Sequence, residues 1–409
     1  MRIGIDGTCW NNNRGFGRFS RELLGAMFAA DQRNTYVVLT DDPPKGVDFG
    51  PRVEVVPVRT RRLVIEAATA DDSRSIGDML AFRRAAGQAA LDVLFFPAVY
   101  SWFPPPRGPA TVVTFHDAIA EHFPALVFPH WRQRLAWNAK TWAAKTLARR
   151  ILTVSQTAKA EIVQYLHIAA ARIDVICEGA AQAYRPVTDP AAQARARRDN
   201  GLPAPMGRPG RLLIYVGGFA PHKNLERLLQ AFDIVLQQPG LADLVLVMTG
   251  DPAGGGFHSI HDRLRAQMAA SPRLAAAVHF PGYVSDPDLA ALHSDALALV
   301  LPSLSEGFGL PALEAMACGA AVLGAHGGAV LEVAGTAGFG FDPLDVADMA
   351  AAITRIATDT ALRDRLRAQA IPQTARNTWP LAAALTIAAL ERAGAGRSRG
   401  GQNQRGRGG

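Results

Sequence analysis

The hydrophobic pattern of the chain consists of short apolar runs separated by longer stretches in which apolar residues recur at helical spacing, as in residues 18–28. Short apolar runs bounded by Gly, Pro or Asp are typical of buried strands. Strands that alternate with helices predict parallel sheets covered on both faces, so we expect an α/β fold. The predicted strands lie at residues 2–6, 36–40, 53–58, 93–96, 111–114, 212–216, 244–249, 278–282 and 296–301.

At 409 residues the chain is long enough for two domains with separate cores. Residues 181–210 contain several prolines and a run of Ala and Arg with little periodic apolarity, which predicts an interdomain linker. Hydrophobic residues make up 49% and charged residues 19% of the chain, as in ordinary soluble proteins. No apolar run approaches the roughly 20 residues of a membrane helix, and the start lacks a signal-peptide pattern. We therefore expect a cytoplasmic location.

The formal net charge of +7 favours acidic partners, and it does not choose between nucleotide phosphates, anionic lipid and nucleic acid. Cys9, Cys177 and Cys318 lie far apart and in no metal or redox spacing, so we expect free thiols.

The stretch 302–321, PSLSEGFGLPALEAMACGAA, carries the most specific chemistry. It follows an apolar strand and contains a glycine turn, and Pro311 suits the first turn of a helix. Gly307 and Gly309 let the backbone approach a ligand closely. The N–H groups near Phe308, Gly309 and Leu310 would then form a phosphate site at the positive end of a helix dipole.

Two carboxylates flank this predicted phosphate site. Glu306 lies in the turn, and Glu314 lies one turn into the helix with its side chain leaning back towards the helix start. Ionised carboxylates accept hydrogen bonds and suit the paired hydroxyls of a sugar or a ribose. A site that binds both phosphate and hydroxyls would fit a nucleotide sugar. The alternative is an ordinary strand–helix joint whose glutamates are solvated.

The spacing from Glu306 to Glu314, within EGFGLPALEAMACG, resembles the E-x7-E signature of the retaining nucleotide-sugar glycosyltransferases of the GT-B fold, family 4. The likeness is to the mannosyltransferase-like subgroup of polysaccharide and O-antigen assembly. It implies two Rossmann-like α/β domains and a C-terminal helix that crosses back to the first domain. The expected divisions are 1–180 for the acceptor-side domain, 181–210 for the linker, 211–376 for the donor domain, 377–392 for the crossover helix and 393–409 for a disordered Arg/Gly tail.

A second element, GGFAPHKN at 217–224, opens the predicted donor domain. Lys223 would present a cation to a bound diphosphate, and Asn224 would cap the following helix. The element resembles the family's G-x-x-x-P-R-K-N, which implies donor binding by Gly217, Gly218 and His222. His222 and Gly218 stand where many relatives have arginine, so Lys223 would be the sole permanent cation on the leaving group.

In the first domain, Gly15 and Gly17 invite a dinucleotide-binding interpretation, which we reject because the loop is too long and Ser20 replaces the third glycine. The resemblance places this loop at the cleft, near the acceptor or the donor phosphates; the alternative is a plain loop without a function in binding. His116 and Asp117 follow a strand at its carboxyl end, where α/β sheets carry their sites, and a histidine there can move a proton. The resemblance implies that His116 acts near the reacting centre; the alternative is a hydrogen-bonded structural histidine.

Residues 130–150 combine tryptophans with many cations, which is typical of a contact with an anionic membrane surface. The alternatives are a helix with its tryptophans in the core or, less favoured, a nucleic-acid contact. Residues 286–288, Asp-Pro-Asp, match a metal-binding D-x-D, but we interpret them as a helix cap and predict no metal.

The resemblance therefore predicts a retaining, metal-independent transferase without a cofactor, peripheral at the inner face of the cell membrane. It would move a hexose, with mannose favoured, from a nucleoside diphosphate sugar to a hydroxyl of a glycan or lipid-linked acceptor in cell-surface polysaccharide synthesis. GDP-mannose is the favoured donor. Glu306, Lys223 and His116 would be catalytic, and Glu314 would bind the ribose. The alternative is a non-catalytic protein that binds nucleotide sugar, or RNA through its Arg/Gly tail.

Overall fold

The computed structural model describes residues 1–12, 15–61, 75–203, 211–250 and 259–395. The chain forms two compact units, each described here by itself. The first comprises Met1–Pro124, Phe128–Glu178 and Trp379–Gly409, and the second comprises Gly179–Thr378 with Ala125–Val127. The prediction of a disordered tail over 393–409 is wrong for residues 393–395, which belong to the C-terminal helix, and residues 396–409 lie outside the described residues.

The first unit is built on a parallel sheet of seven strands in the order β3-β2-β1-β4-β5-β6-β7. Because both faces are covered, central strands such as Val93–Phe96 are apolar and buried throughout. The strands are β1 (Arg2–Asp6), β2 (Thr35–Thr40), β3 (Val53–Pro57), β4 (Val93–Phe96), β5 (Ala110–Thr114), β6 (Arg150–Thr153) and β7 (Ile173–Val175). Its helices are α1 (Gly15–Ala30), α3 (Ile76–Gln88), α4 (Ile119–His122), α6 (Trp131–Leu147), α7 (Gln156–Leu166) and α17 (Trp379–Ala395). Of α5 (Pro124–Val127), only Pro124 is assigned to this unit.

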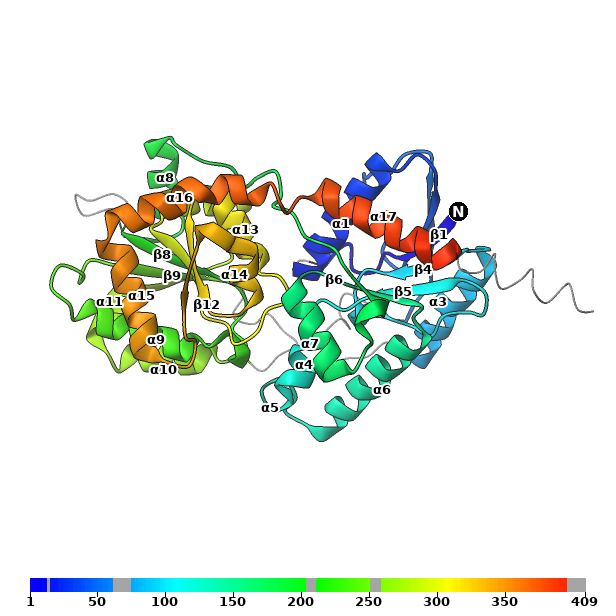
Figure 1. Ribbon diagram of the computed structural model, residues 1–409, viewed down its shortest axis with the longest axis horizontal. Coiled ribbons are helices and arrows are strands. Elements are labelled where there is room, and N and C mark those ends of the chain that lie inside the picture. Colours follow the sequence, from blue (N-terminus) through cyan, green and yellow to red (C-terminus); the bar gives the residue numbers. More distant parts are fainter. Residues whose placement is uncertain (13–14, 62–74, 204–210, 251–258, 396–409) are drawn as a thin grey trace, which may run out of the picture. The chain divides into compact units, whose positions relative to one another are not determined.

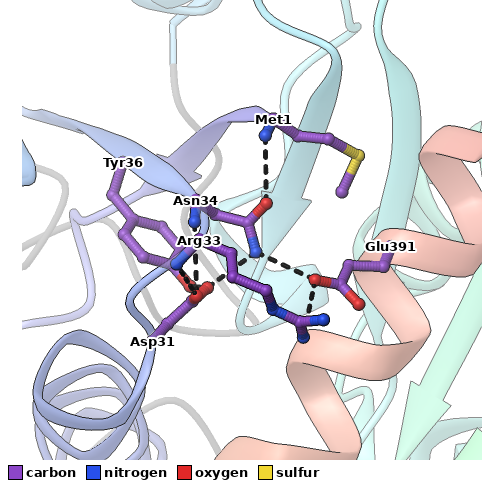
Figure 2. A network of polar contacts seen from close by, with 6 residues as sticks. All are labelled: Met1, Asp31, Arg33, Asn34, Tyr36 and Glu391. Atoms are coloured by element: carbon purple, nitrogen blue, oxygen red, sulfur yellow. Dashed lines mark hydrogen bonds and ion pairs between the residues drawn. The ribbon is translucent and has the colours of Figure 1, made fainter.

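The C-terminal helix α17 is part of the first unit, where it lies beside α1 and packs on β4, β5 and β6 (Figure 1). A polar network fixes its far end (Figure 2). Asn34 Nδ2 donates to Asp31 Oδ2 at 2.7 Å and to Glu391 Oε1 at 3.2 Å. Burial alone would raise the pKa of Asp31, but hydrogen bonds from Tyr36, Arg33 and Asn34 outweigh it and lower that pKa. The network thus joins α17 to the start of β2.

The second unit has a parallel sheet of six strands in the order β10-β9-β8-β11-β12-β13. The strands are β8 (Leu212–Val216), β9 (Val245–Thr249), β10 (Val278–Gly282), β11 (Ala298–Leu301), β12 (Ala321–Ala325) and β13 (Gly338–Phe341). The helices are α8 (Pro190–Asp199), α9 (Leu225–Leu236), α10 (His261–Ala269), α11 (Pro272–Ala277), α12 (Asp286–Asp295), α13 (Leu310–Ala317), α14 (Ala329–Ala334), α15 (Val346–Thr358) and α16 (Thr360–Thr374). Two parallel sheets confirm the predicted α/β fold class.

The strand order places a topological switch in each sheet. In the second unit the chain moves outward from β8 through β9 to β10, then returns to β11 on the other side of β8. In the first unit the same reversal occurs between β1 and β4. Open α/β sheets bind ligands outside the carboxyl ends of the two strands that flank such a switch. The segments that follow β8 and β11 are therefore the place to examine for a site.

The predicted linker, residues 181–210, is not an extended connection over its whole length. It contains α8, which begins at a side-chain cap from Asp189 and packs against α12 of the second unit. Arg197 of α8 forms a buried ion pair with Asp295. Residues 190–199 contain few apolar residues, so the sequence pattern did not predict this helix. What holds the helix in place is an ion pair with a residue far along the chain, which no local pattern reveals. Residues 204–210 lie outside the described part.

Candidate donor site

The turn after β11 has the glycine-dependent geometry that the sequence suggests. Gly309 occupies the N-cap position of α13 with φ of 88°, in the left-handed region that favours glycine. A Cβ there would also lie 3.1 Å from Val330 Cγ2. Pro311 lies in the first turn of α13, and Phe308 is buried beneath the turn. In the first turn of α13, Pro311 has no N–H and the Ala312 N–H donates to the Gly309 carbonyl at 2.8 Å. The Leu310 N–H, at the positive end of the helix dipole, is the donor that this end offers to an anion.

Glu306 and Lys223 meet at this turn. Lys223 Nζ lies 2.8 Å from Glu306 Oε1 and 2.9 Å from Oε2, and Ser303 Oγ donates to Oε1 at 2.6 Å. Burial by itself would raise the pKa of Glu306, but the Lys223 charge and the two donors outweigh it and lower that pKa. The cluster is therefore an ionised carboxylate with a lysine cation, carried by the segments that follow the two switch strands.

Asn224 positions Lys223, although its side chain does not cap the following helix as predicted. It occupies the N-cap position of α9 in a left-handed conformation with φ of 60°, and its side chain makes no capping bond. Its Nδ2 instead donates to the carbonyls of Pro302, at 3.1 Å, and Pro343, at 2.7 Å. The predicted cap is therefore wrong. The Asn224 amide ties the segment after β8 to the turn that carries Glu306.

His222 is buried beside this pair. Burial, with Lys223 adding to the effect, lowers the pKa of His222 to about 3, so the imidazole is neutral near pH 7. His222 thus supplies no permanent cation in place of the family's arginine. Gly217 lies one residue after β8, and a Cβ there would lie 2.7 Å from Tyr215 Oη, which donates to the Gly218 carbonyl at 2.6 Å.

Glu314 is buried on α13, with 3% of its surface exposed. Burial first, and then the charge of Glu314, raises the pKa of Cys318 to about 12. The turn and helix therefore carry Glu306 and Glu314 as the sequence places them. Sequence reasoning missed Ser303, although its position three residues before Glu306 was a usable signal.

His116 and Asp117 lie in the first unit and make local contacts. His116 Nε2 lies 3.0 Å from the Pro97 carbonyl, and Nδ1 lies 3.8 Å from Glu178 Oε1. A carbonyl only accepts, so Nε2 carries the hydrogen. Asp117 Oδ1 accepts from the Ile119 N–H at 3.0 Å. These contacts are those of a hydrogen-bonded structural histidine at the carboxyl end of β5, and any catalytic role of His116 stays a prediction.

The glycines of the first loop differ in what they require. A Cβ on Gly17 would lie 1.9 Å from the Asn12 carbonyl oxygen, so only glycine fits there. Gly15 begins α1 and has open space around it. Arg21 donates to the Trp10 and Asn12 carbonyls at 2.6 and 2.8 Å, which holds the end of the loop against α1. Residues 13–14 are not described.

The Asp-Pro-Asp segment at 286–288 is the first turn of α12, but its cap is Ser285 rather than Asp286. Ser285 Oγ accepts from the Asp288 N–H, and Asp286 accepts from Tyr184 Oη at 2.9 Å. Across the described ranges, no group of three or more His, Cys, Asp or Glu side chains could hold a metal ion. In the same ranges, no helix is long and apolar enough to span a membrane.

Helix α6 divides its tryptophans between the core and the surface. Trp137 is buried and donates to Glu121 Oε1 at 2.8 Å. Trp131, Leu135 and Trp142 are exposed by 70%, 62% and 63%. The sequence left open whether the tryptophans of this helix lie in the core or at the surface. The structure buries Trp137 and exposes Trp131 and Trp142.

The fold and this site together define a class. Two α/β units, with a lysine and two glutamates around a glycine turn at the switch of the second, are the organisation of a GT-B glycosyltransferase. Residues 206–373 match the family model "Glycosyl transferases group 1", and residues 14–181 match "Glycosyltransferase Family 4". Together the two matches span most of the chain, so the chain belongs to this glycosyltransferase family. The matches confirm the family that the sequence motifs predicted.

Known proteins similar to this chain include two from Escherichia coli. The serotype-specific mannosyltransferase WbdA is 32% identical over 249 residues, which are 60% of this chain and 29% of WbdA. The chain thus spans less than a third of the length of that relative. The O-antigen chain mannosyltransferase B is 29% identical over 296 residues, covering 71% of this chain and 72% of the relative. Sucrose-phosphate synthase from Thermosynechococcus elongatus shares the fold, with a TM-score of 0.70 at 20% identity over 96% of this chain and 98% of that structure.

Proposed function

We propose that the protein is a retaining hexosyltransferase that moves a hexose from a nucleoside diphosphate sugar to a hydroxyl of a glycan or lipid-linked acceptor. The observation that carries this proposal is the cluster of Lys223, Glu306 and Ser303 beside the start of α13. The names of the two similar proteins, both mannosyltransferases, favour mannose as the sugar and GDP-mannose as the donor. They also favour a role in cell-surface polysaccharide synthesis.

In this proposal the donor's diphosphate accepts hydrogen bonds from Lys223 and from the Leu310 N–H at the start of α13. The buried carboxylate of Glu314 accepts from the ribose hydroxyls, and Glu306 accepts from the sugar. The main effect on rate is stabilisation of the charge that develops on the leaving diphosphate. Because a lysine and a helix N-terminus supply that positive charge, the proposal needs neither a metal nor a cofactor.

The stereochemical outcome is proposed as retention through a same-face displacement. A leaving phosphate oxygen would accept the proton of the attacking hydroxyl, so no covalent sugar intermediate forms. The anomeric configuration of the product, determined by NMR, tests this step. An inverted product would contradict it.

The first test is calorimetric titration with GDP, UDP and ADP in the presence of a chelator. We expect one nucleotide to bind at micromolar strength, and Glu314→Ala to weaken it by about 1–3 kcal/mol, as for a lost charged hydrogen bond. The control is Glu226→Ala, because Glu226 is a half-exposed glutamate of the same unit that pairs with the exposed Arg263. Equal binding by parent and Glu314→Ala would contradict the assigned site.

The non-catalytic alternative predicts nucleotide or RNA binding without sugar transfer. A chain ending at Ala395, the last residue of α17, separates the two functions, because it keeps the helix and lacks the Arg/Gly tail. Loss of RNA binding with unchanged mannose transfer would make the tail accessory. If the full chain transfers no sugar from the GDP, UDP or ADP form of a hexose, the binding role is favoured.

We also propose that the protein contacts an anionic membrane at the cytoplasmic face through the exposed side of α6. Trp131, Leu135 and Trp142 are spaced by 4 and 7 residues, so they share one face of the helix. Exposed Arg132 and Arg134 flank that face. Indole rings at headgroup depth with adjacent cations are typical of an interfacial contact. Other cations of this region have protein partners: Lys145 donates to the Leu166 carbonyl, and Arg150 pairs with Asp174.

Co-sedimentation with vesicles of phosphatidylcholine, with and without phosphatidylglycerol, tests this contact. We expect binding only to the anionic vesicles, and loss of that binding in the double variant Trp131→Ser/Trp142→Ser. The control is Tyr283→Ser, since Tyr283 is an aromatic residue of the second unit with 79% exposure. Binding that survives in the double variant would contradict the proposed surface.

A further inference from the structure

Ser303 belongs to the Lys223–Glu306 cluster but has been given no contact with the donor; it contacts the carboxylate that is proposed to hold the sugar. Its side chain is buried, with 4% of the residue exposed, and its Oγ donates to Glu306 Oε1 at 2.6 Å. The residue before it, Pro302, is fixed because its carbonyl accepts from the Asn224 amide at 3.1 Å. The Ser303 hydroxyl therefore reaches Glu306 from a fixed backbone.

The two oxygens of Glu306 are not equivalent. Oε1 accepts from both Lys223 Nζ and Ser303 Oγ, whereas Oε2 accepts from Lys223 Nζ alone among the described residues. Each carboxylate oxygen has about two acceptor positions. Oε1 is therefore filled, and Oε2 retains one position for a further donor. A sugar hydroxyl that donates a hydrogen bond to Glu306 would therefore donate to Oε2.

We propose that Ser303 is a positioning residue that sets which hexose epimer the enzyme accepts. This inference rests on the proposed function and deepens it. By occupying Oε1, Ser303 fixes the rotation of the carboxylate and leaves one acceptor in one direction. Only an epimer with a hydroxyl in that direction makes the bond. Without Ser303, Oε1 regains an acceptor position, and the carboxylate can turn to meet hydroxyls of either configuration.

The test compares GDP-mannose with GDP-glucose, whose sugars differ in the configuration of one hydroxyl. It measures the ratio of the two kcat/KM values, and the ratio of the two dissociation constants by titration. We expect the parent to prefer one epimer. In Ser303→Ala the preference falls about tenfold, the size of effect that a lost charged hydrogen bond produces, while binding of GDP itself changes less than about twofold.

Two further variants separate positioning from packing. Ser303→Cys keeps the volume but replaces the hydroxyl with a weak donor, so it should lose selectivity like Ser303→Ala. Ser303→Thr keeps the hydroxyl and should restore the preference. The matched control is Ser271→Ala, because Ser271 Oγ donates to Asp233 Oδ1 at the same 2.6 Å elsewhere in this unit. That variant should lose stability without any change in selectivity.

The outcomes distinguish this inference from the proposed function. Unchanged epimer ratios in folded Ser303→Ala or Ser303→Cys, with the parent active and selective, overturn the positioning role alone. A similar loss of selectivity in Ser271→Ala also overturns it, because the effect would then be general. If the parent neither transfers nor binds either nucleotide sugar, both the proposed function and the positioning role fall. Loss in Ser303→Ala with rescue by Ser303→Thr supports Ser303 as the positioning residue.

Discussion

Glu306 of the second unit and Glu121 of the first are both largely buried, yet their environments drive their ionisation in opposite directions. Burial raises the pKa of each. For Glu306, the Lys223 cation and the Ser303 hydroxyl outweigh burial, and the pKa falls below its usual value. For Glu121, burial dominates, the Trp137 indole N–H offsets only part of it, and the charge of Asp117 adds to it, so the pKa rises to about 7.

This difference shows that a neighbouring cation decides whether a buried carboxylate stays ionised or is driven towards its neutral form. An indole N–H donates one neutral hydrogen bond, which does not replace lost hydration. An ammonium group at 2.8 Å compensates the charge directly. The ionised Glu306 cluster is therefore the one that suits the proposed donor site. Glu121 has a structural role, in which it holds α6 through Trp137.

The largest expected effect comes from removing the cation. Lys223→Met leaves the Glu306 charge buried without its partner, which costs about 3 kcal/mol of stability near pH 7. It also removes the charge proposed to steady the leaving diphosphate, so transfer should fall by about 100-fold or more. Unfolding by urea and steady-state transfer measure the two effects.

The control for this change is Lys159→Met, because Lys159 Nζ donates to the Ile173 carbonyl in the first unit rather than to a carboxylate. It should lower stability far less and leave transfer unchanged. Full transfer activity in Lys223→Met would show that Lys223 does not stabilise the leaving group. The ion pair with Glu306 would then be structural, like the Glu121 contact.

The sequence predicted the α/β class, the family and the local geometry of the glycine turn, because each depends on patterns within a short window. Apolar runs mark buried strands, and Gly309 marks the left-handed turn. It did not predict that Lys223 would pair with Glu306 or that Asn224 would reach Pro302, because these partners are 83 and 78 residues apart. Such contacts arise only when β8 and β11 become neighbours. Helix α8 escaped notice for the same reason.

His293 extends the comparison to a buried ionisable group with no charged partner. It is fully buried on α12, and neither ring nitrogen has a hydrogen-bond partner among the described residues. Burial lowers its pKa to about 3. The unfolded chain takes up a proton near pH 6.5 and the folded chain does not, so stability is lost as pH falls from about 6.5 towards 3. At pH 4.5 this loss is about 3 kcal/mol.

His293→Leu should remove that part of the acid sensitivity. The measurement is the free energy of unfolding at pH 7 and pH 4.5, and the prediction concerns the difference between the two values rather than either one. Parent and variant share the contribution of His222, so it cancels. The exposed His326, changed to Leu, is the control and should keep the parent's pH dependence. If His293→Leu and the parent lose equal stability between pH 7 and pH 4.5, His293 must take up its proton in the folded chain as well, with water reaching the ring.

The smallest expected effect concerns Glu121 and has the opposite sign of pH dependence. Its folded-state pKa of about 7 lies above the unfolded value near 4.5, so the folded chain loses stability as pH rises from about 4.5 through 7. Glu121→Gln keeps an acceptor for the Trp137 N–H and cannot ionise. Between pH 5 and pH 8 the variant should gain about 2.5 kcal/mol of stability relative to the parent.

Urea unfolding at the two pH values measures this gain. Glu54→Gln is the control, because Glu54 is more than half exposed in its ion pair with Arg2 and should give no gain at pH 8. A stabilised Glu121→Gln would show that the first unit tolerates its buried carboxylate at a cost, whereas Glu306 is held charged by Lys223. If Glu121→Gln instead lost stability at pH 8, the Glu121 carboxylate would be ionised and paired, and the contrast between the two glutamates would fail.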